Sequence, residues 1–517
     1  MPHSLTPELR ALQERTEQYA REYGLDFFEI VYELLDWEEI NEVAAYGGYP
    51  ARYPHWRFGM DYDRLSKSSE YGLSKIYELV INNNPAIAYL LEGNSLTDQK
   101  LVMCHVYAHV DFFKNNFAFR STDLNATGRV IDPVAHGHNY RPNRKWVDRI
   151  ANHGAAVRRI IDRHGIDEVE KFIDNCLSLE NLIDPYSPFV VRQHAATEVE
   201  EEEPREIEVP RLRAKEYMDK FINPEEYLQK QREELELKRQ KQKGRHPKEP
   251  IQDVLLFLLG NAPLERWERT ILAIIRDEAY YFSPQIQTKI MNEGWASYWH
   301  SKLMTEAVCD ASEIVDYSDN NAAVLATQPG QLNPYKLGVE LYRSIEDRWN
   351  RGQFGREWEE CSDLDRKKDW DLRLGLGKEK IFEVRRLYND VTFIDEFLTP
   401  EFAMEQGLFS FEWSKRHERF EIASREFKKV KEKLLFQLTN QGNPFIFVED
   451  ANFGNRGELL LSHRHRGVDL RADYSRAAMA ALVRIWKRPV GLRTIVDGKP
   501  TMLRYDGNEY TSVQESS

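Results

Sequence analysis

Apolar residues recur at the three- and four-residue spacing of helix faces along most of this chain. Glycine and proline interrupt the pattern in the aromatic segment YGGYPARYPHWRFGMDYDRL (46–65), which we expect to form a loop. The body of the protein is therefore predicted to be mainly helical. The predicted helices cover residues 5–35, 73–82, 97–118, 144–164, 166–181, 251–260, 264–282, 285–308, 334–351 and 378–397.

The pattern changes near residue 443. Short β-like runs such as FIFVED and GELLLSHRH alternate with turns rich in Gly, Asn and Asp, and one helix is predicted over 473–488. We therefore expect a mainly α fold, with a large helical body and a small C-terminal α/β module. The expected division is a first part of the helical domain (1–191), a charged excursion or linker (192–250), a second part of the helical domain (251–439) and the module (440–517).

The excursion at 192–250 differs from the rest of the chain in its charge. It begins with the acidic, proline-containing stretch EVEEEEPREIEVP and continues as a run of Glu, Lys, Arg and Gln with helical propensity. Such a composition offers little apolar surface for burial, so we interpret the excursion as a solvated surface segment.

Charge and composition narrow the class of protein. A net charge of −14 argues against binding to nucleic acid or to an anionic membrane. No apolar run reaches the roughly 18 residues needed to span a bilayer, and the polar N-terminus lacks the apolar segment of a signal peptide. The four cysteines are far apart and form no CxxC motif. These features favour a protein of the reducing cytoplasm.

The first candidate site is HVYAH, which places His105 and His109 one helical turn apart on the same helix face. Two imidazoles at this spacing suit a tetrahedral metal ion such as zinc. The HExxH motif of zinc proteases has the same spacing, but here Val106 stands in place of its glutamate. The spacing alone is weak support, because 14 histidines in 517 positions give about 0.4 such pairs by chance.

Two later helices also turn polar side chains toward their apolar faces. Glu278 lies on an isoleucine-rich stripe, and Glu293 and His300 lie two turns apart on one face of the next helix. A carboxylate on a buried face is costly unless it is paired, hydrogen-bonded or metal-bound. Together with the histidine pair, these residues fit either a metal site or a buried polar network that holds the helices together.

A second group of histidines occurs in the glycine-containing segment DPVAHGHNYRPNRKW (132–146). Here His136 and His138 stand close to Arg141, a combination that can line a cleft or bind an anionic group. We expect these residues to contact the substrate if the protein is an enzyme. The alternative is a polar surface loop without a function of its own.

Several long strings are unusual enough to compare with known families: YPARYPHWRFGMDYDRL, INNNPAIAYLLEGNS, HVYAHVDFFKNN, CLSLENLIDPY, RDEAYYFSPQIQTKIMNEGWASYWH and NRGELLLSHRHRGVDL. With these strings the chain resembles the stage V sporulation protein R (SpoVR-like) family. The resemblance implies a cytoplasmic bacterial protein linked to formation of the spore cortex, a modified peptidoglycan layer. It also implies stationary-phase or stress roles in bacteria without spores, where relatives are encoded beside a serine protein kinase and a von Willebrand A-like protein.

The segment NEGWASY is similar to the NEGxAxY segment of gluzincin aminopeptidases, in which the glutamate is the third zinc ligand. This likeness implies a zincin-like helical core, with zinc held by His105, His109 and Glu293. Because Val106 cannot accept a proton, we expect Glu278 to act as the catalytic base. His300 is expected to serve as a fourth ligand or as an oxyanion donor.

Two hypotheses of different class follow. In the first, the protein is a zinc-dependent hydrolase of amide bonds in a peptide or a peptidoglycan-type substrate. In the second, it is a non-enzymatic scaffold in a kinase-associated stress or sporulation complex, and the aromatic segment, the charged excursion and the C-terminal module are docking surfaces. A dinuclear iron site is disfavoured, because the relevant helices carry no Glu-x-x-His pairs.

Overall fold

The computed structural model describes residues 4–70, 78–124, 143–189, 209, 218, 221, 223–242, 245–327, 331–414 and 419–515. The chain forms two compact units. The first unit consists of Met1–Glu170 and Tyr280–Asn443, and the second consists of Lys171–Ala279 and Pro444–Ser517. Each unit thus combines two separate stretches of sequence. The domain boundaries expected from the sequence remain predictions.

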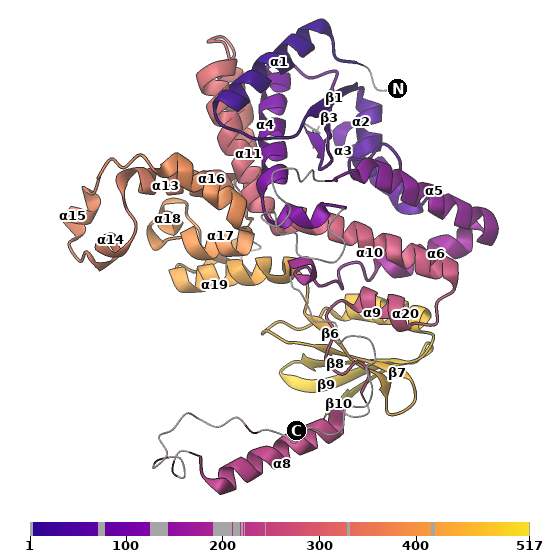
Figure 1. The fold of residues 1–517 in the computed structure, drawn as a ribbon. Coiled ribbons are helices and arrows are strands. Elements are labelled where there is room, and N and C mark those ends of the chain that lie inside the picture. The colour runs from indigo at the N-terminus through magenta and orange to yellow at the C-terminus, as the bar shows by residue number, and fades with distance from the viewer. Residues whose placement is uncertain are drawn as a thin grey trace. The chain divides into compact units, whose positions relative to one another are not determined.

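The fold is mainly α with a small C-terminal α/β module, as predicted (Figure 1). The elements of the first half of the chain are α1 (Pro7–Glu22), β1 (Ile30–Leu35), α2 (Trp37–Ala45), α3 (Trp56–Glu70), β2 (Leu79–Ile81), β3 (Ala86–Leu91), α4 (Leu96–Asn115), η1 (Ala118–Thr122), α5 (Trp146–His164), α6 (Ile166–Leu177), η2 (Ser187–Phe189), α8 (Glu225–Gln242) and α9 (Val254–Asn261).

The elements of the second half are α10 (Arg266–Gln287), α11 (Lys289–Leu303), η3 (Met304–Val308), α12 (Ile314–Val324), α13 (Pro334–Arg351), α14 (Arg356–Glu360), α15 (Leu364–Lys368), α16 (Gly377–Leu387), α17 (Asp390–Phe397), α18 (Pro400–Glu405), β4 (Ser410–Ser414), β5 (Arg419–Ser424), α19 (Phe427–Leu438), η4 (Thr439–Gly442), β6 (Ile446–Phe453), β7 (Glu458–His463), α20 (Ala472–Trp486), β8 (Val490–Val496), β9 (Lys499–Tyr505) and β10 (Tyr510–Gln514).

Three local predictions were wrong. In two of them, segments predicted to be helical form strands of a sheet inside the helical body. The helix expected over 5–35 ends at Glu22, and its last six residues form β1. Residues Leu79–Ile81, expected to be helical, form β2. The expected loop at 46–65 contains the start of α3. Short apolar runs such as IVYELL suit a buried strand as well as a helix, and only long-range pairing decides between them.

This sheet of the helical body has the strand order β1-β3-β2. Strand β1 pairs with β3 in parallel, and the short β2 pairs with β3 in antiparallel orientation, with Leu79 opposite Tyr89. Strand β3 leads directly into α4, which also contacts β2. The pairing of β2 in this sheet therefore places the residues just before β2 close to α4.

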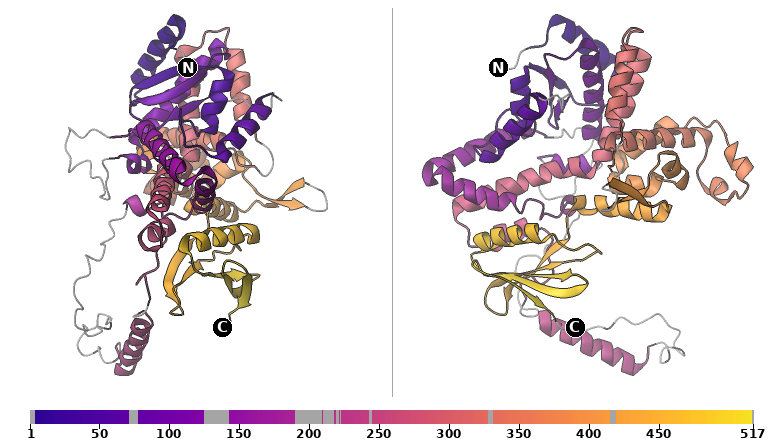
Figure 2. Two further views of the ribbon diagram at one scale, coloured as in Figure 1. Left: turned by 90° about the vertical axis from the view of Figure 1, so that its right-hand side faces the viewer. Right: turned by 180° about the vertical axis from the view of Figure 1, so that it is seen from behind.

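Helix α4 is the central helix of the first unit. Its N-terminus is capped by Ser95, whose hydroxyl accepts the Asp98 amide hydrogen at 3.1 Å. Residues on all of its faces are buried, as expected for a helix surrounded by other elements. Figures 1 and 2 show α4 and α11 running side by side, and the two helices are in contact.

Polar groups inside the core fix α4 and α11 to each other. The carboxylate of Asp111 on α4 accepts a hydrogen bond from the indole of Trp295 on α11 at 2.8 Å, and it pairs with Arg385 of α16 at 3.1 Å. Asp390 accepts the backbone amide hydrogens of Ile290 and Met291, each at 2.9 Å, at the N-terminus of α11. Both carboxylates are buried, so the register between these helices is strongly specified.

Helices α11 and α13 cross at two glycines. A Cβ atom built on Gly294 would overlap the backbone of Gly338, and one built on Gly338 would overlap the backbone of Ile290 and Gly294. Only glycine at both positions permits this separation of the backbones. The crossing places Glu293, the residue before Gly294, near the first turn of α13.

The C-terminal module belongs to the second unit and is built on a five-stranded sheet of order β10-β9-β8-β7-β6. Helix α20 connects β7 to β8, which pair in parallel, while the other neighbouring strands are antiparallel. In Figure 1, α9 and α20 lie along one face of this sheet. Met479, Leu482 and Ile485 are buried on α20, as the apolar spacing of the predicted helix requires.

Candidate metal centre

Four side chains from three elements of the first unit converge at one point. They are Glu78, which directly precedes β2, His105 and His109 on α4, and Glu293 on α11. Each residue offers one nitrogen or oxygen atom, and these atoms all lie within 4.8 Å of one another. Two imidazoles and two carboxylates form a donor set that binds zinc and other divalent ions.

The outer nitrogen of each histidine is held by a hydrogen-bond partner. His109 Nδ1 lies 2.9 Å from the side-chain oxygen of Asn292, so this nitrogen carries the hydrogen and donates it. His105 Nδ1 lies 2.8 Å from His300 Nδ1, and His300 Nε2 lies 3.1 Å from the side-chain oxygen of Asn321. One assignment satisfies this chain: His105 donates to His300, and His300 donates to Asn321.

When both rings are neutral, this assignment leaves the Nε2 lone pairs of His105 and His109 directed at the carboxylates of the cluster. His105 Nε2 lies 3.1 Å from Glu78 Oε1, and the two Nε2 atoms lie 3.8 and 3.5 Å from Glu293 Oε2. Ligand atoms on a tetrahedral zinc ion lie about 3.3 Å apart, given metal–ligand bonds of about 2.0–2.1 Å. The separations to Glu293 are therefore too long for good hydrogen bonds but near those of atoms that share an ion.

Two buried atoms of the cluster face each other without a good hydrogen bond: His105 Nε2 and Glu293 Oε2, which lie 3.8 Å apart. The closest carboxylate oxygen to His105 Nε2 is Glu78 Oε1 at 3.1 Å. Two largely buried carboxylates around one point are costly unless a positive charge lies between them. Either a proton on His105, as in a buried polar network, or a divalent ion supplies that charge.

The charges of the cluster favour a positive charge at this point, which is a proton on His105 when no metal ion is bound. Burial alone lowers the pKa of His105, but the charge of Glu78 and the contact with Glu293 outweigh burial and raise the pKa to about 9. Burial alone raises the pKa of Glu293, but His105 and His109 hold it well below its usual range. The pKa of His300 is lowered to about 3, chiefly by burial, so this ring is neutral and can accept a hydrogen bond from His105.

Tyr335, in the first turn of α13, borders the cluster. Its ring centroid lies 6.4 Å from that of His105. Burial, together with the nearby charges of Glu293 and Glu78, raises the pKa of its hydroxyl far above the usual value. The hydroxyl therefore stays protonated and is available as a donor next to two carboxylates. The crossing at Gly294 and Gly338 brings this turn close to Glu293.

The structure brings together the three residues predicted as metal ligands: His105, His109 and Glu293. His300 contacts the cluster through the outer nitrogen of His105 and does not contribute a ligand atom to the group of four. Glu278 is buried on α10 and is not among the four residues of the group. His136, His138 and Arg141 lie outside the described residues, so their expected role in substrate binding remains a prediction.

Four contributors were not predicted. Glu78 lies in the middle of the segment 73–82 that was predicted to be helical, and only the pairing of β2 with β3 places it beside α4. Asn292 is next to Glu293 in the sequence, and this position is the signal that could have indicated its contact with His109. Asn321 and Tyr335 lie on other helices, and no spacing in the sequence links them to the histidines.

The chain is similar in sequence to a known protein family and to one of its relatives. Residues 4–443 match the family model described as SpoVR like protein. The chain belongs to the SpoVR-like family. It is also 30% identical over 478 residues to the uncharacterized protein YcgB of Escherichia coli (strain K12), covering 87% of this chain and 84% of YcgB. No solved structure matches the chain.

Membership of the SpoVR-like family connects the chain with sporulation. The four residues of the candidate centre all fall inside the matched residues 4–443, whereas all five strands of the C-terminal sheet lie beyond them. Among the residues that the structure describes, no helix combines the length and the apolar character needed to cross a bilayer.

Proposed function

We propose that this SpoVR-like protein is a metal-dependent hydrolase, with zinc held by His105, His109 and Glu293. One observation carries the proposal: the outer nitrogens of both histidines have partners, while the ligand atoms of His105, His109, Glu78 and Glu293 all lie within 4.8 Å of one another. Fixing the outer nitrogen selects the tautomer whose Nε2 binds a metal, as is usual for metal-ligating histidines.

When bound at such a site, zinc supplies Lewis-acid chemistry and lowers the pKa of a water ligand to near neutrality. The chain must provide a proton acceptor beside the ion, since Val106 occupies the position of the usual glutamate. Glu78 suits this role better than Glu278, because Glu78 is part of the cluster. Its side chain is 21% exposed, against 16% for Glu293, and so remains accessible to water.

Tyr335 supplies a hydrogen-bond donor on another side of the cluster. A protonated hydroxyl near the metal ligands can stabilise negative charge that develops on the carbonyl oxygen of an amide under attack. Glu78 and Tyr335 come from different segments, the residue just before β2 and the first turn of α13, so the acceptor and the donor belong to separate parts of the fold.

Amide bonds are the substrate class that this arrangement suits best. The similarity of NEGWASY to the gluzincin segment and the cortex link of the family favour a peptide or a peptidoglycan-type substrate. We place the reaction in the cytoplasm, so a peptidoglycan precursor fits better than the mature wall. A serine protein kinase and a von Willebrand A-like protein are the proposed partners from the family context.

The second candidate is a scaffold in such a kinase-associated complex. Exposed apolar residues on α3 favour this alternative, since Trp56 is 53% and Met60 is 62% exposed, one helical turn apart. A scaffold needs no open metal position, so loss of the metal ligands would then change stability alone.

Substitution at Glu78 tests the hydrolase directly. The zinc-loaded full chain is incubated with peptide amides and with stem peptides of peptidoglycan precursors, and amine release is followed by mass spectrometry. We expect Glu78→Gln to lower the rate about 10²- to 10⁴-fold with unchanged zinc content, as for loss of a general base. Glu293→Gln should lose the zinc ion. Glu278→Gln serves as the control and should keep both the hydrolysis rate and the zinc content of the wild type.

The proposal fails if the zinc-loaded protein hydrolyses none of these amides. It fails in its assignment of the base if Glu78→Gln retains the rate while Glu278→Gln loses it.

A further inference from the structure

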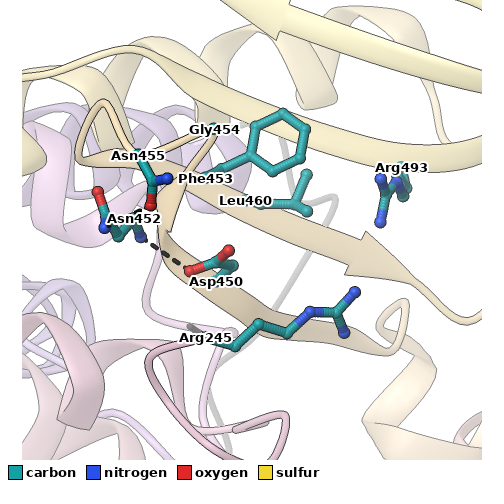
Figure 3. Close-up of a pocket in the computed structure, with 8 residues that line it drawn as sticks. All are labelled: Arg245, Asp450, Asn452, Phe453, Gly454, Asn455, Leu460 and Arg493. Carbon is teal, nitrogen blue, oxygen red and sulfur yellow. Dashed lines mark hydrogen bonds between the residues drawn. The ribbon is translucent and has the colours of Figure 1, made fainter. Parts of the chain in front are cut away.

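The second unit contains a hollow at the edge of the C-terminal sheet, with a volume of about 260 Å³ (Figure 3). This size is near the lower limit of small-molecule sites, which run from about 300 Å³ upward. Its lining residues are Arg245, Asp450, Asn452, Phe453, Gly454, Asn455, Leu460 and Arg493.

Asp450 supplies a fixed negative charge. Its side chain is buried, with the residue 9% exposed, and its Oδ1 atom accepts the backbone amide hydrogens of Asn452 at 2.9 Å and of His246 at 3.5 Å. The Oδ2 atom accepts no hydrogen bond from any residue of the described ranges. The carboxylate is thus held by one oxygen and has the other available to a ligand in the hollow (Figure 3).

Arg245 supplies a positive charge on a fixed backbone. The segment that follows it adds to the edge of β6: Ala451 donates its amide hydrogen to His246, and Ile251 exchanges two backbone hydrogen bonds with Val448 at 3.0 and 2.8 Å. The guanidinium of Arg245 forms no ion pair with any carboxylate in the described part of the chain, although Asp450 lines the same hollow. Two opposite charges therefore share one cavity without neutralising each other.

The remaining wall is neutral or apolar. Arg493 pairs with Glu515 at 3.2 Å and with Glu449 at 3.6 Å, and its guanidinium lies 5.6 Å from the ring centroid of Phe453. This arginine is already compensated, so among the described residues that line the hollow Arg245 is the cation without an ion pair. Phe453 and Leu460 form an apolar side next to the two charges (Figure 3).

We propose that this hollow binds a small zwitterion of the amino-acid class, either a free amino acid or a whole dipeptide with its two charged ends. Asp450 accepts hydrogen bonds from the ammonium group, Arg245 binds the carboxylate, and Phe453 contacts the apolar part of the ligand. Charge-assisted hydrogen bonds at both ends explain why one acidic and one basic side chain face the same small cavity. An anion alone meets repulsion from Asp450, and a cation alone meets repulsion from Arg245.

The hollow shares no residue with the candidate metal centre, and it is lined almost entirely by residues beyond the match to the family model at 443. Its ligand is therefore independent of the proposed hydrolase. Failure at either site leaves the other unaffected.

Calorimetric titration of the full chain with the common amino acids and with matching dipeptides tests the proposal. We expect at least one compound to bind, and its N-acetylated and its carboxamide forms to bind at least about tenfold more weakly, since each lacks one charge. Tighter binding of dipeptides than of free amino acids identifies a dipeptide as the ligand, and the reverse identifies a free amino acid.

Variants locate the ligand in the hollow. Arg245→Ala and Asp450→Asn should each weaken binding about tenfold or more. Lys248→Ala removes a positive charge from the same segment without lining the hollow, and it should change binding less than about twofold. The proposal is overturned if no compound of either series binds, or if binding is the same in the wild type, Arg245→Ala and Asp450→Asn.

Discussion

At the scale of single residues, the candidate centre depends on which nitrogen of each histidine carries a hydrogen. His105 and His109 both have the outer nitrogen engaged, His105 through His300 and then Asn321. Groups that hold the outer nitrogen orient the ring and increase its basicity as a ligand. His300 contacts the candidate centre through His105, and its expected role as a direct ligand or an oxyanion donor remains a prediction.

Two adjacent asparagines on α12 provide a matched test of this chain of hydrogen bonds. Asn321 accepts from His300 at 3.1 Å, whereas Asn320 donates to Asp98 at 2.8 Å. We expect Asn321→Ala to weaken zinc binding about tenfold, as for loss of a group that orients a metal-ligating histidine. Asn320→Ala should leave zinc affinity unchanged, and competition with a zinc-binding dye measures both. Equal zinc affinities in the two variants would show that the hydrogen bond between His300 and Asn321 does not contribute to zinc binding.

At the scale of elements, the crossing of α11 and α13 sets the positions of Glu293 and Tyr335. Gly338→Ala places a methyl group against the backbone of Ile290 and Gly294, and the helices must separate. We expect the free energy of unfolding to fall by about 1–3 kcal/mol or more, measured by urea denaturation. Gly260→Ala on α9 meets no atom within 4 Å and is the control, which should be neutral or slightly stabilising. A Gly338→Ala protein as stable as the wild type would show that the crossing is loose.

The N-terminus of α11 gives a pH-dependent prediction. Burial raises the pKa of Asp390 to about 7, although hydrogen bonds from Ile290 and Met291 oppose the rise. Because this acid binds its proton more tightly in the folded state, folding is favoured below its unfolded pKa, and this advantage is lost as pH rises toward 7. Between pH 5 and 7, the free energy of unfolding of the wild type should therefore fall relative to Asp390→Asn by up to about 1.4 kcal/mol per pH unit.

Urea denaturation of both proteins at pH 5, 6 and 7 measures this difference. A constant difference across the three pH values would show that Asp390 keeps an ordinary pKa.

Helical periodicity predicted α4 and α13 to within three residues of their ends and α11 to within five, and with α4 and α11 it predicted three residues of the candidate centre. The spacing of His105 and His109 is local, so one helix fixes their common face. Glu78 reaches the same point through strand pairing, which brings together residues distant in sequence and leaves no local pattern. The same reason explains why β1 was interpreted as helix.

At the scale of the whole molecule, each compact unit is assembled from two stretches that alternate along the chain. The candidate metal centre lies in the first unit and the zwitterion hollow in the second. Sequence periodicity describes one element at a time, so it does not indicate which stretches pack into one unit. The small C-terminal sheet was predicted because its short strands and turns are adjacent in sequence.

The zinc content of the full chain, purified without a histidine tag and measured by inductively coupled plasma mass spectrometry, tests the central claim most directly. We predict about one zinc ion per chain in the wild type and almost none in His105→Ala or Glu293→Ala, as for a site with three protein ligands. His465→Ala, which removes a histidine paired with Asp469 at 2.7 Å, should retain the metal. A wild-type protein that takes up no zinc, or variants that hold as much as the wild type, would contradict the proposed centre.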